Sequence, residues 1–377
     1  MVLLPSYYTV KVAGAPLPMP FLTALKQIEV ETSTEQAGVF RLHFELSQTP
    51  IGDWDVLQFD IFRPLVPMSI SVSVLLGLGE TIINGYLNEA RLENRTEPGK
   101  SKLTVVGMDA TATVMNLHQK PFPWPNLPDS EIARAILGQY GIVPVAVPTP
   151  PRRTILQTTT IQRTTDIRVL KELARRNGFE CYVQPDPLIG INTGYFGPAQ
   201  VLMPPQGVLS VNFGLATNME NFDVRYEMLQ PTSALAMALD PATKGPMPNI
   251  APLALESPMG LEPALLRILV PPVVRPTATD AANAGELMAM TQSIVNRSSR
   301  ALHGTGEVDG LRYGRVLRPG LPVAVRGAGR EHSGIYYVTQ VTHSISTDHY
   351  SQRIEGWRNA VGLTGAELFI DPYAAIS

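Results

Sequence analysis

Three histidines and an aspartate near the C-terminal end are the residues whose types could bind a metal ion. His332, His343, Asp348 and His349 fall within eighteen residues of the sequence, and imidazole and carboxylate groups together suit zinc. Their spacing provides neither an i, i+4 pair on a helix nor paired positions on a strand. We expect His343 on a strand, His332 in the loop before it and His349 in the turn after it, and we predict no metal site.

The segment Gly304–Gly310, GTGEVDG, has the glycine content of a phosphate-binding loop but not its pattern. Its glycines are spaced GxGxxxG, it follows a predicted helix instead of preceding one, and it lacks the Lys-Ser or Lys-Thr pair of such loops. We therefore interpret it as a helix stop followed by the approach to a hairpin.

Residue patterns of hydrolytic enzymes are missing from the sequence. It contains neither a GxSxG nor an HExxH motif. The acidic pairs Asp53/Asp55 and Glu29/Glu31 fall on predicted strand edges or turns, where carboxylates are ordinarily solvated and do not form the acid–base pair of a glycosidase. We predict that the protein is not an enzyme and uses no cofactor.

Positive charge is concentrated between residues 152 and 176. The basic residues of this stretch are Arg152, Arg153, Arg163, Arg168, Lys171, Arg175 and Arg176. Aromatic residues do not alternate with them, so a nucleic-acid platform is not indicated. Two interpretations stay open: a solvated helix face, or a docking patch that forms arginine–carboxylate forks with another protein. The residues predicted for such a patch are Arg152, Arg153, Arg168, Arg175 and Arg176.

Length and composition limit the class of protein. A chain of 377 residues exceeds what one hydrophobic core usually supports, so we expect more than one domain. The net charge of −3 gives no global reason to bind nucleic acid or an anionic membrane. The single cysteine, Cys181, excludes an intrachain disulfide and predicts a buried thiol in a reducing cytoplasm. We expect neither a signal peptide nor a membrane segment, since no apolar run approaches roughly 20 residues.

Strands separated by turns dominate residues 1–112. In FRLHFEL and SISVSVLL, apolar residues alternate with polar ones, so each strand buries one face. This pattern predicts a barrel-like β domain. The apolar residues are Phe40, Leu42, Phe44, Ile70, Val72 and Val74. The predicted strands are Tyr7–Val12, Leu25–Glu31, Gly38–Leu46, Val56–Phe62, Ser69–Leu76, Ile82–Glu93 and Lys102–Gly107.

Residues 113–205 have the character of an inserted α/β domain. A proline-rich connection leads to a helix that begins near Asp129 and stops at Gly141. In Thr164–Val183, four apolar residues recur at helical spacing, a threonine hydroxyl caps the helix, and Gly178 stands where a left-handed residue is needed. A strand follows, so a helix-to-strand unit is predicted. The four apolar helix residues are Ile167, Leu170, Leu173 and Ala174.

The remaining sequence predicts a second β-barrel domain, formed by residues 206–228 and 264–360. A helix fits residues 280–301, capped by Thr279 or Asp280. Residues 229–263 are predicted to be a proline-rich loop, because ten prolines between residues 231 and 276 disfavour both helices and strand ladders. Residues 361–377 are expected to form a C-terminal tail.

Three segments in a fixed order resemble one known family. They are SEIARAILGQYGIVPVAVP, the unit TTDIRVLKELARRNGFECYV, and RPGLPVAVRGAGREHSGIYYVTQVTHSIS. Together they resemble the phage late control protein D family, the hubs of contractile-tail baseplates, and the N-terminal half of type VI secretion VgrG spikes. VgrG continues into an oligosaccharide-binding-type barrel and a repetitive β-helix that are not found here. The resemblance therefore implies a separate spike protein, and it makes His343 a structural residue at a strand end.

The resemblance also implies a mechanism based on symmetry. In the family, a homotrimer with two tube-like domains per chain forms a pseudo-six-fold ring that joins a six-fold inner tube to a three-fold spike. Expected partners are the inner tube or tube-initiator protein, a separate spike and baseplate wedge proteins. The protein would be made in the bacterial cytoplasm and assembled into a phage tail or contractile injection particle. Residues expected on ring-forming strands are Phe40, Leu42, Phe44, Ile70, Val72, Val74, Val323, Val325, Tyr336, Val338 and Val341.

Two alternatives come from other functional classes. A tail-associated hydrolase that degrades cell wall or glycan would need a cleft with a perturbed carboxylate pair, which the sequence does not offer. A sugar-binding module would need exposed tryptophans, and Trp54, Trp124 and Trp357 all lie beside structural segments.

Overall fold

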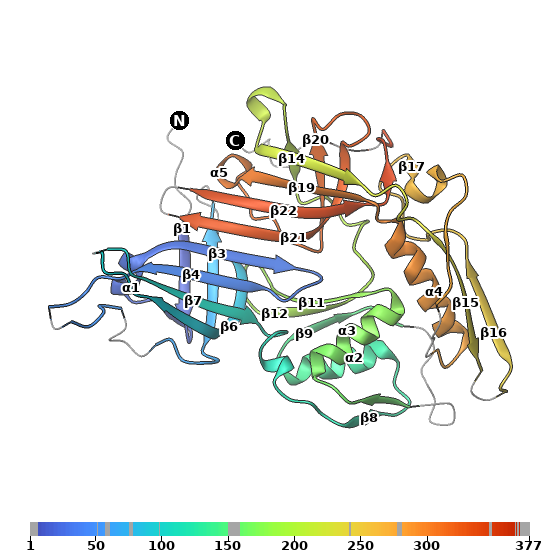
Figure 1. The fold of residues 1–377 in the computed structure, drawn as a ribbon, viewed down its shortest axis with the longest axis horizontal. Coiled ribbons are helices and arrows are strands. Elements are labelled where there is room, and N and C mark those ends of the chain that lie inside the picture. The colour runs from blue at the N-terminus through green and yellow to red at the C-terminus, as the bar shows by residue number, and fades with distance from the viewer. Residues whose placement is uncertain are drawn as a thin grey trace.

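The computed structural model describes residues 7–50, 52–56, 61–74, 78–97, 99–149, 159–240, 243–276, 281–346, 349–365, 367 and 369. Strands make up 43% of it and helices 18%, which confirms the mainly β architecture predicted from the sequence. Figure 1 shows two strand-rich halves that lie against each other, an α/β module beside them, and a helix-and-hairpin unit at one end. The closure of either half into a barrel stays a prediction.

The N-terminal half follows the alternation of its sequence. Phe40, Leu42 and Ile70 are fully buried in one core, whereas Arg41 and His43 between them stay partly exposed. The predicted strand 56–62 and the end of the strand 69–76 fall partly outside the described residues. The elements are β1 (Tyr7–Val12), β2 (Ala15–Pro16), α1 (Met19–Ala24), β3 (Leu25–Ser33), β4 (Val39–Glu45), β5 (Pro67–Ser73), β6 (Glu80–Glu93) and β7 (Lys102–Asp109).

The C-terminal half encloses a separate core. Val323, Val325 and Val341 are fully buried there, and the rings of Phe222 and Tyr336 meet edge to face at 5.2 Å. Its elements are β13 (Val208–Ser210), η2 (Gly214–Ala216), β14 (Met219–Tyr226), β17 (Glu262–Pro263), η3 (Ala264–Arg267), β19 (Leu302–Asp309), α5 (Gly310–Tyr313), β20 (Pro322–Arg326), β21 (Gly334–Ser346), β22 (Tyr350–Arg358) and β23 (Ala360–Val361).

One hydrogen-bonded junction joins the two halves into a continuous sheet. β21 pairs antiparallel with β3, so that Val341 lies opposite Thr32 and His343 lies opposite Val30. The strand order is β14-β19-β22-β21-β3-β4-β7-β6-β5-β1-β2, with β20 added to β21 and β13 added to β20. The strand edges at which the two halves meet are therefore satisfied within the chain.

The glycine-rich segment Gly304–Gly310 lies mainly on a strand, so its interpretation as a helix stop and hairpin approach is wrong. β19 runs through Gly304 and Gly306. A Cβ on Gly304 would lie 2.8 Å from the Phe222 ring, and one on Gly306 would lie 2.5 Å from the Met219 side chain. These glycines leave room for large side chains of the neighbouring strand β14.

The α/β module packs two helices around a third core. Ile136, Leu170 and Phe196 are fully buried between α2, α3 and a small mixed sheet in which β12 pairs with β11 and β9. The predicted helix at Asp129 is confirmed. The elements are η1 (Val114–Asn116), β8 (Phe122–Trp124), α2 (Asp129–Gln139), β9 (Val143–Ala146), β10 (Thr160–Gln162), α3 (Asp166–Asn177), β11 (Glu180–Pro185) and β12 (Asn192–Gly197).

The two ends of α3 were predicted with different success. Gly178 has a φ of 68° directly after the helix, which confirms the predicted left-handed position. The predicted threonine cap is wrong. Thr165 occupies the cap position, but its hydroxyl donates to the Asn116 side chain at 2.8 Å and makes no capping bond.

The proline-rich segment is not a loop throughout, which corrects the prediction for residues 229–263. β15 (Ser233–Leu239) and β16 (Pro246–Ala251) form an antiparallel hairpin, and β18 (Val273–Val274) pairs with β15 in parallel. Pro246 and Pro248 both lie on β16, at an edge of this three-stranded sheet. The two prolines are two residues apart on an edge strand, so both face the same way. Proline has no backbone N–H group, and at these positions the hydrogen-bond ladder with β15 does not need one.

The helix predicted for residues 280–301 is shorter than expected. α4 spans Ala284–Ser299, and the side chain of Asn283 caps it by accepting from Glu286 N at 2.9 Å. The predicted caps Thr279 and Asp280 lie outside the described residues. Within the described ranges, no helix has the length and apolarity that a membrane-spanning helix needs.

Candidate functional site

The side chains predicted on ring-forming strands belong to the interior of the single chain. All eleven are buried, and none is more than 7% exposed. They pack into the cores of the N-terminal and C-terminal halves. The side chains themselves serve these cores, and the ring-forming role of the strands that carry them stays a prediction. The residues are Phe40, Leu42, Phe44, Ile70, Val72, Val74, Val323, Val325, Tyr336, Val338 and Val341.

The predicted arginine patch separates into residues with different roles. Arg168 and Arg175 are exposed on α3, while Arg152 and Arg153 lie outside the described residues. Arg176 turns into the module, where its Nε lies 2.5 Å from Asp129 Oδ2 and its Nη2 pairs with Asp129 Oδ1. Since its side chain is only 15% exposed, Arg176 is a structural residue and is corrected as a member of the docking patch.

A second ion pair holds the beginning of α3. Asp166 accepts from Lys120 Nζ at 2.5 Å, Tyr140 Oη at 2.5 Å and Gln162 Nε2 at 2.6 Å. Burial alone would raise the pKa of Asp166, but these three donors hold that pKa below its usual value. The charges on this side of α3 are therefore paired with partners inside the module.

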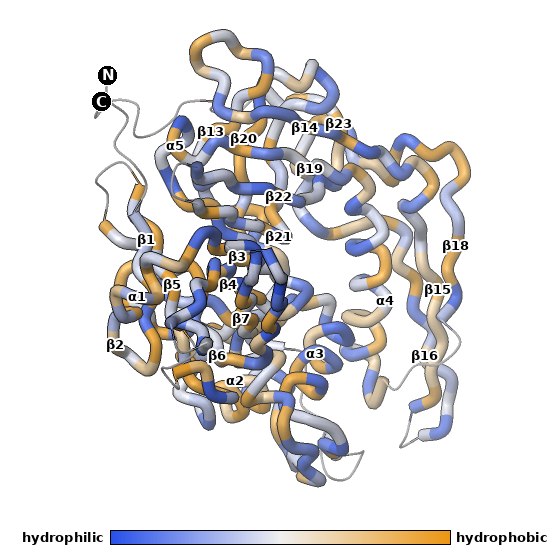
Figure 2. Tube along the Cα trace, turned by 60° about the vertical axis from the view of Figure 1, so that its left-hand side comes forward, coloured by the Kyte–Doolittle hydropathy of each residue, from blue (hydrophilic) through white to orange (hydrophobic). Residues whose placement is uncertain are grey.

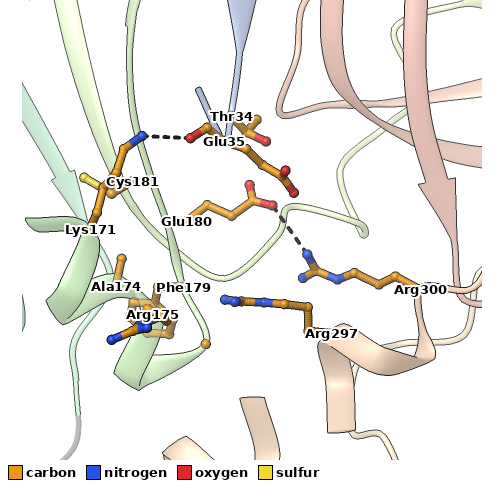
Figure 3. A pocket seen from close by; sticks show the side chains of 11 residues that line it. Thr34, Glu35, Lys171, Ala174, Arg175, Phe179, Glu180, Cys181, Arg297 and Arg300 are labelled. Carbon is orange, nitrogen blue, oxygen red and sulfur yellow. Dashed lines mark hydrogen bonds and ion pairs between the residues drawn. The ribbon is translucent and has the colours of Figure 1, made fainter. Parts of the chain in front are cut away.

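The other side of α3 faces a cavity of about 330 Å³. Figure 3 shows side chains from α3, β11, α4 and the turn after β3 around this pocket. Gly178 brings α3 and α4 together, since a Cβ at Gly178 would lie 2.7 Å from the Ser293 Cβ. The lining residues are Thr34, Glu35, Lys171, Ala174, Arg175, Gly178, Phe179, Glu180, Cys181, Arg297 and Arg300.

The floor of this pocket is a buried charge network. Arg300 donates to Glu256 through Nη2 at 2.7 Å and Nε at 3.2 Å, and its guanidinium lies 4.1 Å from the centre of the Trp357 ring. Glu180 accepts a hydrogen bond of 2.5 Å from Tyr337 Oη, and Arg300 Nη1 is 3.8 Å from it. Burial raises the pKa of Glu180 to about 7, although Arg300 and Tyr337 oppose that rise.

The rim of the pocket holds cations whose charge is not neutralised in the same way. Lys171 Nζ donates to the backbone oxygen of Glu35 at 2.7 Å. Within the part of the chain that the structure describes, neither Arg175 nor Arg297 forms a side-chain hydrogen bond or ion pair. Desolvation lowers the pKa of Arg297, and the positive charges of Arg300 and Arg175 lower it further, whereas the carboxylates of Glu35 and Glu180 oppose this shift. This arrangement can bind an anion.

The structure separates the residues considered for metal binding. His343 lies on β21, fully buried, with Nδ1 3.0 Å from the hydroxyl of Tyr350. Burial lowers the pKa of His343 to about 3, so the ring is neutral at physiological pH. Asp348 lies outside the described residues, and no group of three or more His, Cys, Asp or Glu side chains placed to hold a metal is found among the described ones.

Sequence reasoning missed Arg297, Arg300, Glu180 and Glu256 as members of one site. They come from α4, the end of that helix, β11 and the segment before β17, so no spacing pattern links them. The one available signal was Gly178, whose predicted left-handed turn brings α3 against α4.

Comparisons with known proteins bear on the fold. No family model matches the sequence, and no curated protein matches it. A tail protein from Neisseria meningitidis has a similar fold, with a TM-score of 0.62 and 13% identity over 94% of this chain and 97% of that one. The 43 kDa tail protein of prophage MuSo2 from Shewanella oneidensis gives a TM-score of 0.66 and 14% identity over 95% and 100% of the two chains.

A type VI secretion system component from E. coli is a third similar structure. It gives a TM-score of 0.56 and 13% identity, covers 93% of this chain and 76% of its own, and is described as similar to the T4 bacteriophage tail proteins gp27 and gp5. The chain therefore has a fold shared with phage and prophage tail proteins and with a component of the type VI secretion system.

Proposed function

We propose that this protein is the baseplate hub of a contractile injection machine, with a structural and not an enzymatic role. The observation that carries this proposal is the similarity of the whole fold to two tail proteins, which extends over 94% and 95% of this chain. Similarity confined to one domain would be compatible with many functions, because common folds host unrelated activities. Here the similarity covers nearly the whole chain and is therefore not confined to one half or to the α/β module.

In the proposed hub, three copies surround one axis and contribute two strand-rich halves each. Six similar units would then face a six-fold inner tube, while the three-fold relation between chains matches a separate spike protein. The continuous sheet through the β3–β21 junction supports this arrangement, because it fixes the two halves of one chain side by side. Wedge proteins would dock at the periphery of the ring, and the particle would assemble as a phage tail or related injection device.

An exposed apolar face supports assembly with further copies. On the β15–β16 hairpin, Leu235 pairs with Ile250, Met237 with Pro248, and Leu239 with Pro246. Met237 is 64% exposed and Ile250 is 68% exposed. The alanines between these residues face α4 instead. Both views place the hairpin at the outer end of the molecule, beyond α4 (Figures 1 and 2).

We assign this hairpin face to the contact between copies in the trimer. Large contiguous apolar patches on the surface of soluble proteins commonly mark sites of interaction with other molecules. The prolines on β16 block strand addition at that edge, so contact through the face is favoured over contact through the edge. In a symmetric homotrimer, this face of each copy contacts the same surface of the next copy.

Light scattering behind size exclusion tests the proposal. We expect a mass near three times 41.0 kDa for the wild-type chain. The double variant Met237→Glu/Ile250→Glu should shift the mass toward one copy, because it places charge in the apolar contact. Leu188→Glu is the matched control, since Leu188 is 67% exposed on a different loop. A wild-type monomer at high protein concentration would contradict the trimer.

A further inference from the structure

The pocket between α3, β11 and α4 carries more positive charge than its own carboxylates neutralise. Its basic side chains are Lys171, Arg175, Arg297 and Arg300, and its acidic ones are Glu35 and Glu180. Arg300 is already occupied by Glu256 through two hydrogen bonds. Glu180 is buried and accepts from Tyr337. The charge left open to a ligand is therefore on the rim.

Arg297 is the central group of this rim. It projects from α4 toward the end of α3, as Figure 3 shows, with Arg300 beside it. Its side chain is exposed and has no hydrogen-bonding partner among the described residues. Arg300 and Arg175 repel its charge, whereas Glu35 and Glu180 attract it. A guanidinium exposed at the mouth of a pocket can form two charge-assisted hydrogen bonds with a carboxylate.

The charges of the pocket favour a monoanion over a phosphate. Lys171, Arg175 and Arg297 give three positive charges outside the Arg300–Glu256 pair. Glu35 at the edge and Glu180 at the floor oppose a second negative charge on the ligand. A carboxylate, with one charge and two oxygens in a plane, matches the fork of an arginine.

The walls of the pocket suit an acidic side chain. Ala174, Phe179 and Cys181 present apolar surface beside the cations, so the methylene groups of a glutamate can pack where its carboxylate reaches Arg297. We propose that this pocket receives the carboxylate of an acidic side chain from a protein that docks on this face. The identity of the docking protein as an assembly partner rests on the proposed function, but the carboxylate site itself does not.

Calorimetric titration of the purified chain with butyrate tests the site. We expect about millimolar affinity for butyrate, as is usual for so small a ligand, and none for the neutral butyramide. Arg297→Gln should weaken binding about tenfold or more, because it removes a charged hydrogen-bond donor. Glu35→Gln should strengthen binding by about two- to fivefold, since it removes a competing carboxylate at the rim. Arg168→Gln, which removes the same charge outside the pocket, should change nothing.

Two further titrations identify the source of the carboxylate. The capped tripeptide acetyl-Gly-Glu-Gly-amide should bind at least as tightly as butyrate if the natural ligand is a protein side chain. Inorganic phosphate should bind more weakly than butyrate. Binding that is unaltered in Arg297→Gln, tighter binding of phosphate, or no binding of the peptide would each overturn the proposal. Far-UV circular dichroism at the titration temperature shows that the variants are folded.

The titrations test the pocket and the light-scattering mass tests the hub, so each proposal can fail without the other. A trimer that binds neither butyrate nor the peptide would overturn the pocket proposal and leave the hub intact. A monomer that binds both through Arg297 would support the carboxylate site and contradict the hub.

Discussion

Helix α3 serves two regions of the molecule with charges of the same kind. On the side that faces α2, Arg176 pairs with Asp129, and both side chains are nearly buried. On the side that faces α4, Arg175 is exposed and Arg297 lies opposite it without a partner among the described residues. In the first region an ion pair holds the module together. In the second region the positive charges remain available to a ligand. An arginine that is paired with a carboxylate inside the protein has a structural role, and an unpaired arginine is available to a ligand. The number of arginines in a region does not make this distinction.

The largest expected effect comes from breaking the paired side. Arg176→Met leaves the Asp129 carboxylate nearly buried with only Asn177 as a side-chain donor, which should lower the free energy of unfolding by about 3–5 kcal/mol. Arg175→Met, one residue away but exposed, should change it by less than about 0.5 kcal/mol. Urea unfolding followed by circular dichroism measures both. Equal losses in the two variants would remove the distinction between the two sides.

The floor of the pocket should give stability a dependence on pH. The pKa of Glu180 is about 7 in the folded protein, above its usual value of 4.5, so the folded state binds the extra proton. The contribution of protonated Glu180 to the free energy of unfolding is fully present below pH 4.5. It is lost as the pH rises through about 7. A shift of this size corresponds to a loss on the order of 3 kcal/mol.

Glu180→Gln isolates that contribution. The variant should match the wild type near pH 4 and be more stable near pH 8, as measured by urea unfolding at each pH. His343 acts in the opposite direction, because its lowered pKa makes stability fall as the pH drops below about 6.5. Only the difference between variant and wild type therefore reports on Glu180. A difference that does not change with pH would contradict the raised pKa.

The junction between the two regions depends on one glycine. Gly178→Ala adds a Cβ that would lie 2.7 Å from Ser293 Cβ, at a residue with φ of 68°. We expect a loss of about 2–4 kcal/mol from backbone strain and overpacking together. The double variant Gly178→Ala/Ser293→Gly should recover the packing part and keep the backbone part. No recovery in this double variant would show that α3 and α4 do not meet as described.

The smallest effect on stability should fall on the unpaired side. Arg297→Gln removes an exposed charge that two arginines repel and two glutamates attract, so the free energy of unfolding should change by less than about 0.5 kcal/mol. The same variant should lose carboxylate binding. A loss of stability comparable with that of Arg176→Met would mean that Arg297 has a structural partner.

Local patterns in the sequence predicted the parts of the fold that depend on local chemistry. The alternation around Phe40 and Ile70 gave the strands β4 and β5 correctly, and Gly178 gave the end of α3. The hairpin at Pro246 was missed, because a proline count cannot show that the prolines share one side of an edge strand. Alternation also marks which residues are buried without showing whether a core or a subunit contact buries them.

The pocket could not be predicted from spacing. Arg297 and Glu180 are more than one hundred residues apart, and they meet because α3 packs against α4 across a glycine. The basic cluster at residues 152–176 indicated charge in the right module, but Arg176 and Arg175 are neighbours with opposite roles. Only the direction of each side chain, which the tertiary packing decides, distinguishes them.

The symmetry of the purified protein tests the central claim most directly. Electron cryomicroscopy of the full chain should show three copies around one axis, with two strand-rich halves per copy forming a ring of six similar units and the β15–β16 hairpin at the contact between copies. A monomer, a two-fold dimer, or a ring in which only one half of each chain faces the axis would contradict the account of this protein as a hub.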